Sequence, residues 1–169
     1  MQKVFHFVCC VRVFVLVDEK ISLNSIRTNS IQRPDYNLVA FFPYKLPSAI
    51  IDWPLSSCLN IHPSLFPKYR GPDPIFWQLY NNEPATGVTL HLVSADIDAG
   101  PIISQKATAY IEGAKRDQIE ISLSQVGAKL CTEFVSTNSA QGRSHIPQNE
   151  SNSSYNPFPP PHNYDHTTH

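Results

Sequence analysis

Three residues from two separate segments carry the side chains best suited to catalysis. Asn60 and His62 lie in the stretch NIHPS, and Asp98 opens the stretch DAGP. An amide and an imidazolium can both donate hydrogen bonds to an oxygen on which negative charge develops. A carboxylate beside the imidazole favours the charged ring, and it can also position a water that moves a proton. We therefore predict a catalytic site made of Asn60, His62 and Asp98.

The elements expected around these residues predict an α/β domain with an open, mostly parallel sheet flanked by helices. A helix starting at Pro74 after an Asp73 cap is typical of a helix N-terminus. A strand over residues 57–61 places Asn60 and His62 at its carboxyl end, where ligands bind in open α/β sheets. Apolar runs and helical periodicity predict further strands over 36–42, 87–93, 102–105 and 107–111, and further helices over 47–52 and 117–136.

The two ends of the chain differ from this regular centre. Residues 4–17 form an apolar run shorter than the roughly 20 residues of a membrane span, so we expect a buried strand and no membrane partner. Past residue 137 the chain is rich in Ser, Asn, Pro and His, which predicts a disordered C-terminal tail. We divide the chain into an N-terminal segment of unassigned role (1–34), a catalytic core (35–136) and the tail (137–169).

Composition narrows the class of protein. The chain has 169 residues, 41% of them hydrophobic, and a formal net charge of -1, which suits one domain. The net charge gives no strong field to attract nucleic acid, although a local basic patch could still exist. The four cysteines show no paired CxxC spacing, so we expect reduced thiols in a cytoplasmic protein. The histidines of the tail have no ligand cluster at fixed spacing, and we expect no metal site.

Several stretches occur in the order of one enzyme family. They are NIHPSLFPKYRG at 60–71, PIFW at 74–77, TGVT at 86–89 and DAG at 98–100. Over about residues 35–134 the chain resembles the folate-dependent formyltransferases, and in particular the N-terminal catalytic domain of the methionyl-tRNA formyltransferase branch. The resemblance implies a Rossmann-type fold and 10-formyltetrahydrofolate as the co-substrate. It also implies transfer of a formyl group to an amine, with Asn60, His62 and Asp98 at the catalytic positions.

Two further sets of residues are candidates for the site. The resemblance implies Phe42, Tyr44 and Leu46 in the folate pocket, although aromatic residues that end a strand are usually core. The second set, Ser64, Arg70 and Gly71, consists of candidates for contact with the substrate. Ser64 has no GxSxG context, which favours a capping or turn role over a nucleophile. Arg70 could contact an anionic substrate, or Gly71 could simply permit a tight turn, and the sequence leaves both readings open.

The resemblance leaves the acceptor and the activity open. The amine could belong to an aminoacyl-tRNA, a nucleotide or an amino sugar, and the oligomeric state is not indicated. Only 59 residues precede Asn60, whereas the family usually carries a fuller run of β and α units there. Two alternatives to a transferase therefore stand: a hydrolase of formyltetrahydrofolate that uses water as acceptor, and a truncated, non-catalytic remnant of the family.

Overall fold

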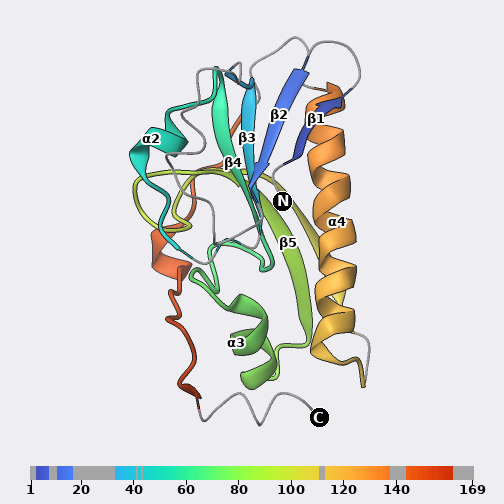
Figure 1. Cartoon of the computed structure of the whole chain (residues 1–169). Coiled ribbons are helices and arrows are strands. Elements are labelled where there is room, and N and C mark those ends of the chain that lie inside the picture. The colour runs from blue at the N-terminus through green and yellow to red at the C-terminus, as the bar shows by residue number, and fades with distance from the viewer. Residues whose placement is uncertain are drawn as a thin grey trace.

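The chain folds around one open sheet that carries a long helix along one face (Figure 1). The computed structural model describes residues 3–7, 11–16, 33–40, 42, 44–110, 113–137 and 144–161. The strands are β1 (Lys3–Phe7), β2 (Val11–Leu16), β3 (Tyr36–Ala40), β4 (Ser57–His62), β5 (Ala85–Leu92) and β6 (Ile102–Ala109). The helices are α2 (Ser48–Ile51), α3 (Pro74–Tyr80), α4 (Arg116–Thr137) and the short 3-10 helix η1 (Glu150–Asn152).

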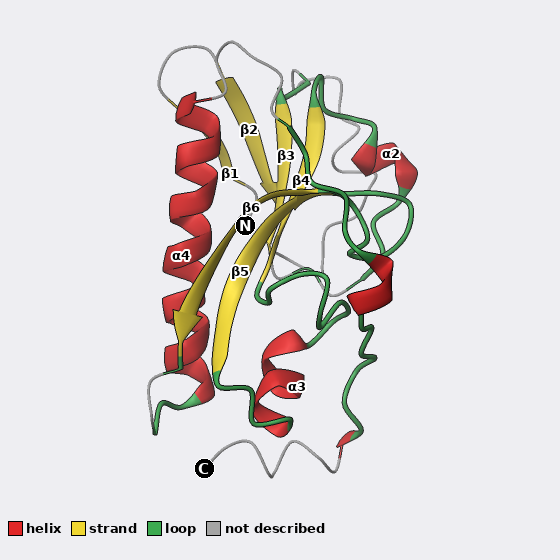
Figure 2. Ribbon diagram, turned by 180° about the vertical axis from the view of Figure 1, so that it is seen from behind, coloured by secondary structure: helices red, strands yellow, loops and turns green. Residues whose placement is uncertain are grey.

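The sheet is mixed rather than mostly parallel. Its six strands follow one another in chain order, β2, β3 and β4 pair in parallel, and the β1–β2, β4–β5 and β5–β6 pairs are antiparallel. Parallel neighbours need a long crossover connection, and the loop of residues 93–101 between β5 and β6 is too short to provide one. The predicted α/β class and the open sheet flanked by helices are confirmed (Figure 2).

Two predicted strand boundaries are wrong. Residues 4–17 do not form one strand, because β1 and β2 pair antiparallel as a hairpin, with residues 8–10 and 17 outside the described part. At the other edge, the two strands expected over 102–105 and 107–111 are the single strand β6. Lys106 continues its ladder opposite Val88, so the polar position does not interrupt the strand.

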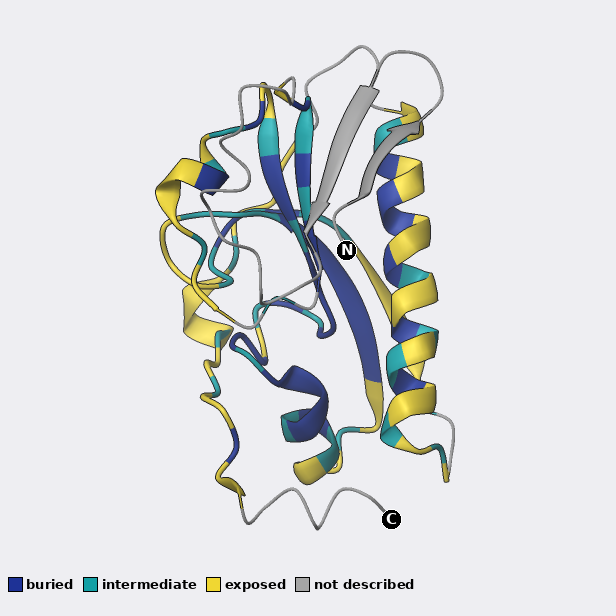
Figure 3. Ribbon diagram, viewed as in Figure 1, coloured by how far each residue is buried: buried dark blue, intermediate teal, exposed yellow. Residues whose placement is uncertain are grey.

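The two faces of the sheet pack against different helices. On β4, Leu59 and Ile61 join the core that includes Leu123 of α4, whereas Cys58 packs with Ile50 of α2. Successive side chains of a strand point to opposite faces, so residues 58, 60 and 62 share the face away from α4. The side of α4 that faces the sheet is its buried side (Figure 3). Asn60 and His62 are therefore directed away from the larger core.

The C-terminal segment of residues 144–161 is not the disordered tail that its composition predicts. It forms a bridge to β6 at Ile146, and Tyr155 pairs with Arg70 in a second bridge. In Figure 1 this orange-to-red segment runs along the side of the molecule remote from α4 and past α3. Composition fails here because the segment is held by backbone and polar contacts to the domain instead of by a core of its own. Residues 162–169 lie outside the described part.

The cysteines agree in part with the expected reduced thiols. Cys58 and Cys131 are free and buried, and burial raises the pKa of each thiol to about 12, helped at Cys58 by the charge of Asp52. Such thiols are poor nucleophiles. Cys9 and Cys10 lie outside the described residues. Across the described ranges, no helix has the length and apolar character that crossing a membrane would require.

Candidate functional site

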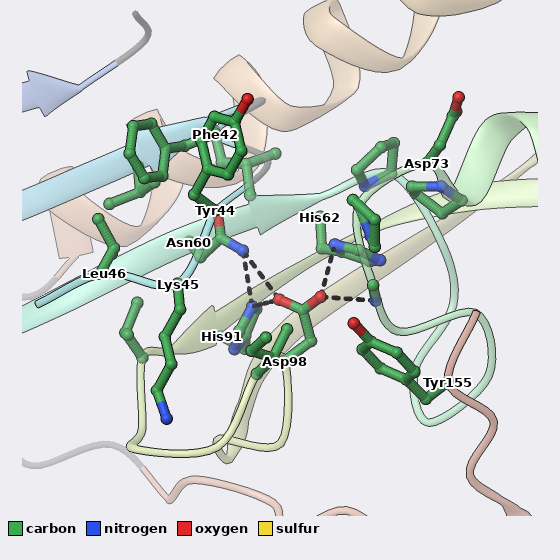
Figure 4. Close-up of a pocket in the computed structure, with 18 of the residues that line it drawn as sticks. Phe42, Tyr44, Lys45, Leu46, Asn60, His62, Asp73, His91, Asp98 and Tyr155 are labelled. Atoms are coloured by element: carbon green, nitrogen blue, oxygen red, sulfur yellow. Dashed lines mark hydrogen bonds and ion pairs between the residues drawn. The ribbon is translucent and has the colours of Figure 1, made fainter. Parts of the chain in front are cut away.

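The structure brings Asn60, His62 and Asp98 together (Figure 4). Asn60 Nδ2 donates to Asp98 Oδ1 at 3.3 Å, and His62 Nδ1 lies 3.5 Å from Asp98 Oδ2. The backbone N–H of Gly71 donates to the same Oδ2 at 2.9 Å. Three donors, two from the end of β4 and one from the turn after it, therefore converge on a carboxylate from the loop that follows β5.

Local backbone geometry explains this convergence. Asn60 and His62 are two residues apart on β4 and share one face of the sheet. Asp98 has a φ of 55°, in the left-handed region, which turns the loop that follows β5 back toward β4. A Cβ on Gly100 would collide with the carbonyl of Leu92, so only glycine allows this loop to lie so close to β5.

Both ring nitrogens of His62 face acceptors. Its Nε2 lies 2.8 Å from the carbonyl oxygen of Tyr69, which can only accept, and its Nδ1 faces the Asp98 carboxylate. A neutral ring can donate to one of these acceptors, whereas the imidazolium donates to both. The ring is buried, with 5% of the residue exposed, and packs against Phe66 at 4.7 Å between centroids. The expected effect of Asp98 on His62 therefore has a geometric basis.

His91 is a further member of the site that the sequence analysis did not identify. It lies opposite Asn60 in the antiparallel β4–β5 pairing, so both side chains occupy the same face. Its Nδ1 lies 2.8 Å from the Leu92 carbonyl and must donate, which leaves Nε2 to accept from Asn60 Nδ2 at 3.1 Å. Burial is the largest cause that lowers the pKa of His91 to about 4. The ring is therefore neutral at pH 7, and its Nε2, 3.7 Å from Asp98 Oδ1, is not half of an ion pair.

A cavity of about 460 Å³ opens beside the trio. Asn60, His62 and Asp98 form part of its wall, and Phe42, Tyr44 and Leu46 form another part. The rings of Phe42 and Tyr44 meet edge to face, with centroids 6.0 Å apart. The wall is thus apolar and aromatic on one side and polar on the other. The residues that we assigned to a folate pocket border the same cavity as the trio, and their contact with folate stays a prediction.

Two residues assigned to the substrate lie elsewhere. Ser64 has no exposed surface, and its hydroxyl donates to the Lys68 carbonyl at 2.9 Å, so it stabilises the turn after β4. Arg70 is also buried, and its guanidinium binds Glu150 and Gln148 of the C-terminal segment. Both substrate assignments need correction, because these side chains are occupied within the protein and do not line the cavity.

Gly71 differs from its two neighbours in the prediction, because it does line the cavity. Its φ is 111°, and a Cβ there would collide with the backbone carbonyl of Asn156. The tight turn that the sequence left open as an alternative is therefore present. The same turn also presents the Gly71 N–H to Asp98.

An ion pair that the sequence analysis missed forms another part of the cavity wall. Asp73 caps α3 by accepting from the Phe76 N–H at 3.3 Å, as predicted. Its carboxylate also receives two hydrogen bonds from Arg116, the first residue of α4, at 2.9 and 3.1 Å. Asp73 and Arg116 both line the cavity. This bidentate pair fixes the start of α4 against the start of α3.

The fold and the site define a class of domain. Domains of this class have an open α/β sheet and bind a ligand in a cavity at the end of a central strand, which polar residues of that strand and of a neighbouring loop line. Residues 22–135, more than half of the chain, match the formyl transferase family. The chain belongs to this family. The predicted resemblance is thus confirmed at the level of the family.

Among curated relatives, the chain is 38% identical over 125 residues to methionyl-tRNA formyltransferase of Syntrophus aciditrophicus, covering 74% of this chain and 40% of the relative. It is 37% identical over 119 residues to the Thermotoga maritima protein of the same name, covering 70% of this chain and 37% of the relative. The chain thus spans about 40% of the length of the first of these relatives.

Solved structures agree in fold. HypX of Aquifex aeolicus in complex with tetrahydrofolic acid has a TM-score of 0.68 and 23% identity, covering 77% of this chain and 22% of HypX. The formyltransferase PseJ of Anoxybacillus kamchatkensis, in complex with a formamido sugar nucleotide and tetrahydrofolate, has a TM-score of 0.68 and 24% identity. That match covers 83% of this chain and 71% of PseJ.

Proposed function

We propose that this chain transfers the formyl group of 10-formyltetrahydrofolate to an amine, with Asn60, His62 and Asp98 as the catalytic residues. The observation that carries the proposal is the convergence of these three side chains on the wall of a cavity whose other wall contains Phe42 and Tyr44. The volume of about 460 Å³ lies within the roughly 300–1,000 Å³ of small-molecule sites. A flat pterin ring suits the aromatic wall, and a formyl group suits the donors.

The chemistry follows from the donors that surround Asp98. The attacking amine forms a bond to the formyl carbon, the bond from that carbon to N10 of folate breaks, and negative charge develops meanwhile on the formyl oxygen. Asn60 Nδ2 and His62 Nδ1 are 3.3 and 3.5 Å from the Asp98 oxygens, which is long for charge-assisted hydrogen bonds. Both donors can turn to a stronger acceptor. An oxyanion in the cavity would be such an acceptor.

Asp98 would move the proton in this scheme. Its carboxylate lies 3.5 Å from His62 Nδ1, and it can hold a water between the attacking amine and the departing nitrogen. The proton lost by the amine would then pass to N10 of folate, so that tetrahydrofolate and the formylated amine are the products. His91 would hold the Asn60 amide in place, because its neutral Nε2 accepts one of the two amide hydrogens.

The acceptor is proposed from the relatives. The curated relatives are methionyl-tRNA formyltransferases and PseJ is crystallised with a formamido sugar nucleotide, so we place the acceptor among aminoacyl-tRNAs and amino sugar nucleotides. Methionyl-tRNA is the first candidate, because the relatives of that name reach 38% identity.

The test uses the purified full chain with 10-formyltetrahydrofolate. Release of tetrahydrofolate is measured alone, with methionyl-tRNA and with an amino sugar nucleotide. We expect release that depends on one of these amines. Release at the same rate without any amine would make the chain a hydrolase, and absence of both release and folate binding by calorimetry would refute the proposal.

A further inference from the structure

A side chain outside the cavity connects Arg70 to the backbone carbonyls of Asp98 and Gly100. The amide nitrogen of Gln148 donates to the carbonyl oxygen of Asp98 at 2.8 Å and to that of Gly100 at 2.7 Å. Its amide oxygen accepts from Arg70 Nε at 3.1 Å and from Arg70 Nη2 at 2.8 Å. These three partners, Arg70, Asp98 and Gly100, use all the hydrogen-bonding capacity of this amide.

The loop that Gln148 contacts needs external support. Asp98 has a φ of 55°, a left-handed conformation that is unfavourable for a residue other than glycine. Two donors from Gln148 hold its carbonyl and that of Gly100, while the Gly71 N–H holds its carboxylate at 2.9 Å. Gly71 directly follows Arg70. The Asp98 backbone is therefore held by Gln148, which Arg70 binds, and the Asp98 side chain is held by the residue next to Arg70.

We infer that Gln148 is a positioning residue, which holds the Asp98 carboxylate at Asn60 and His62 from outside the cavity. This inference rests on the proposed catalytic role of Asp98. Gln148 does not line the cavity, so it acts through the Asp98 backbone rather than on a substrate. The C-terminal segment thereby supports the site through the side-chain amide of Gln148.

Glu150 offers a matched control in the same segment. It binds Arg70 through Nη1 at 3.0 Å and Nη2 at 2.8 Å, and its side chain is largely exposed. The variant E150Q weakens the contact between the segment and Arg70 but leaves the two donors to the Asp98 loop. The variant Q148E does the reverse, because a carboxylate still accepts from Arg70 but has no N–H for the two carbonyls. Q148M removes both interactions with little change in volume.

Kinetics of tetrahydrofolate release separate these roles. For Q148E and Q148M we expect kcat to fall about tenfold, from the loss of two hydrogen bonds, with KM for 10-formyltetrahydrofolate within about twofold of the wild type. E150Q should keep kcat within about twofold. A Q148E protein with wild-type kcat, or an E150Q protein as slow as Q148E, would overturn the inference.

A second measurement keeps the inference testable if the wild type has no activity. Hydrogen exchange of the Gly71 amide reports whether the Asp98 carboxylate is in place, because that N–H donates to Asp98 Oδ2. In Q148E and Q148M this amide should exchange about tenfold faster than in the wild type, and in E150Q at the wild-type rate. Unchanged exchange in both Gln148 variants would reject the positioning role. An inactive wild type with the expected exchange pattern would reject the proposed function alone.

Discussion

Asn60 Nδ2 lies 3.1 Å from Nε2 of His91, and this contact identifies the tautomer of a buried histidine. Because the other nitrogen of His91 faces the Leu92 carbonyl at 2.8 Å, only the neutral ring with its proton on Nδ1 satisfies both partners. Protonation of His91 would bring a donor against the Asn60 amide. The ring is also buried, with 1% exposed. The two histidines of the site thus differ in their partners: both nitrogens of His62 face acceptors, whereas Nε2 of His91 faces a donor.

The stability of the protein should depend on His91 below pH 6.5. Burial lowers the pKa of His91 from its ordinary value of 6.5 to about 4 in the folded chain. Between pH 6.5 and pH 4, His91 therefore binds a proton in the unfolded chain but not in the folded chain. The free energy of unfolding falls as the pH drops through this range. The full effect corresponds to about 3 kcal/mol.

Urea unfolding at pH 7 and pH 4.5 checks this expectation. From pH 7 to pH 4.5, the free energy of unfolding should fall by about 2 kcal/mol more in the wild type than in H91Q. The matched change H145Q removes an exposed histidine and should leave the wild-type dependence in place. Equal losses in the wild type and H91Q would show that His91 titrates normally in the folded chain.

Asp98→Asn should reduce the rate much more than the stability. The asparagine has nearly the same size and keeps an oxygen for the Gly71 N–H, so the free energy of unfolding should change by less than about 1 kcal/mol. It lacks the negative charge beside His62 and the basic oxygen for proton transfer. Tetrahydrofolate release should therefore slow by about 100-fold or more. The remote change D117N, at the start of α4, is the control, and a D98N protein with an undiminished rate would contradict the catalytic role.

Much of the site was predictable because it depends on local patterns. The strand predicted over 57–61 placed Asn60 and His62 at its carboxyl end, and the Asp73-Pro74 pair marked the start of α3. His91 was not predictable from such local patterns. Its role depends on an antiparallel pairing with β4, and the direction of pairing is set by connections and packing that a single segment does not reveal.

The same limit explains the errors at the C-terminal segment. Composition alone indicates how much apolar surface a segment can bury, and residues 144–161 have little of it. Their order depends on specific partners: the buried guanidinium of Arg70 pairs with Glu150, and Trp77 Nε1 donates to the Pro157 carbonyl at 2.8 Å. A lone arginine in the sequence is compatible with an anionic substrate and with an anionic side chain of the same protein. Only the fold distinguishes the two.

Gly71→Ala should destabilise the protein more than an alanine at another glycine with positive φ. Gly71 has a φ of 111°, and a Cβ would collide with the Asn156 carbonyl, so the turn and the C-terminal segment must separate. Gly113 has a φ of 72° but nothing within 4 Å of a Cβ. G113A should cost about 1 kcal/mol, and G71A at least about 2 kcal/mol more. Urea unfolding of both variants measures the difference, and equal costs would mean that the segment does not pack on Gly71 in solution.

Phe42→Ala should weaken the binding of tetrahydrofolate. Phe42 borders the cavity and its ring meets that of Tyr44, so its removal takes an aromatic surface from the wall on which we place the pterin. Loss of one aromatic contact of about 1.4 kcal/mol corresponds to a tenfold higher Kd. Calorimetric titration with tetrahydrofolate measures it, and L55A, which removes an exposed side chain away from the cavity, is the control. If F42A and L55A bound tetrahydrofolate equally well, the pterin would have to lie elsewhere in the cavity. The aromatic wall would then contact the acceptor instead.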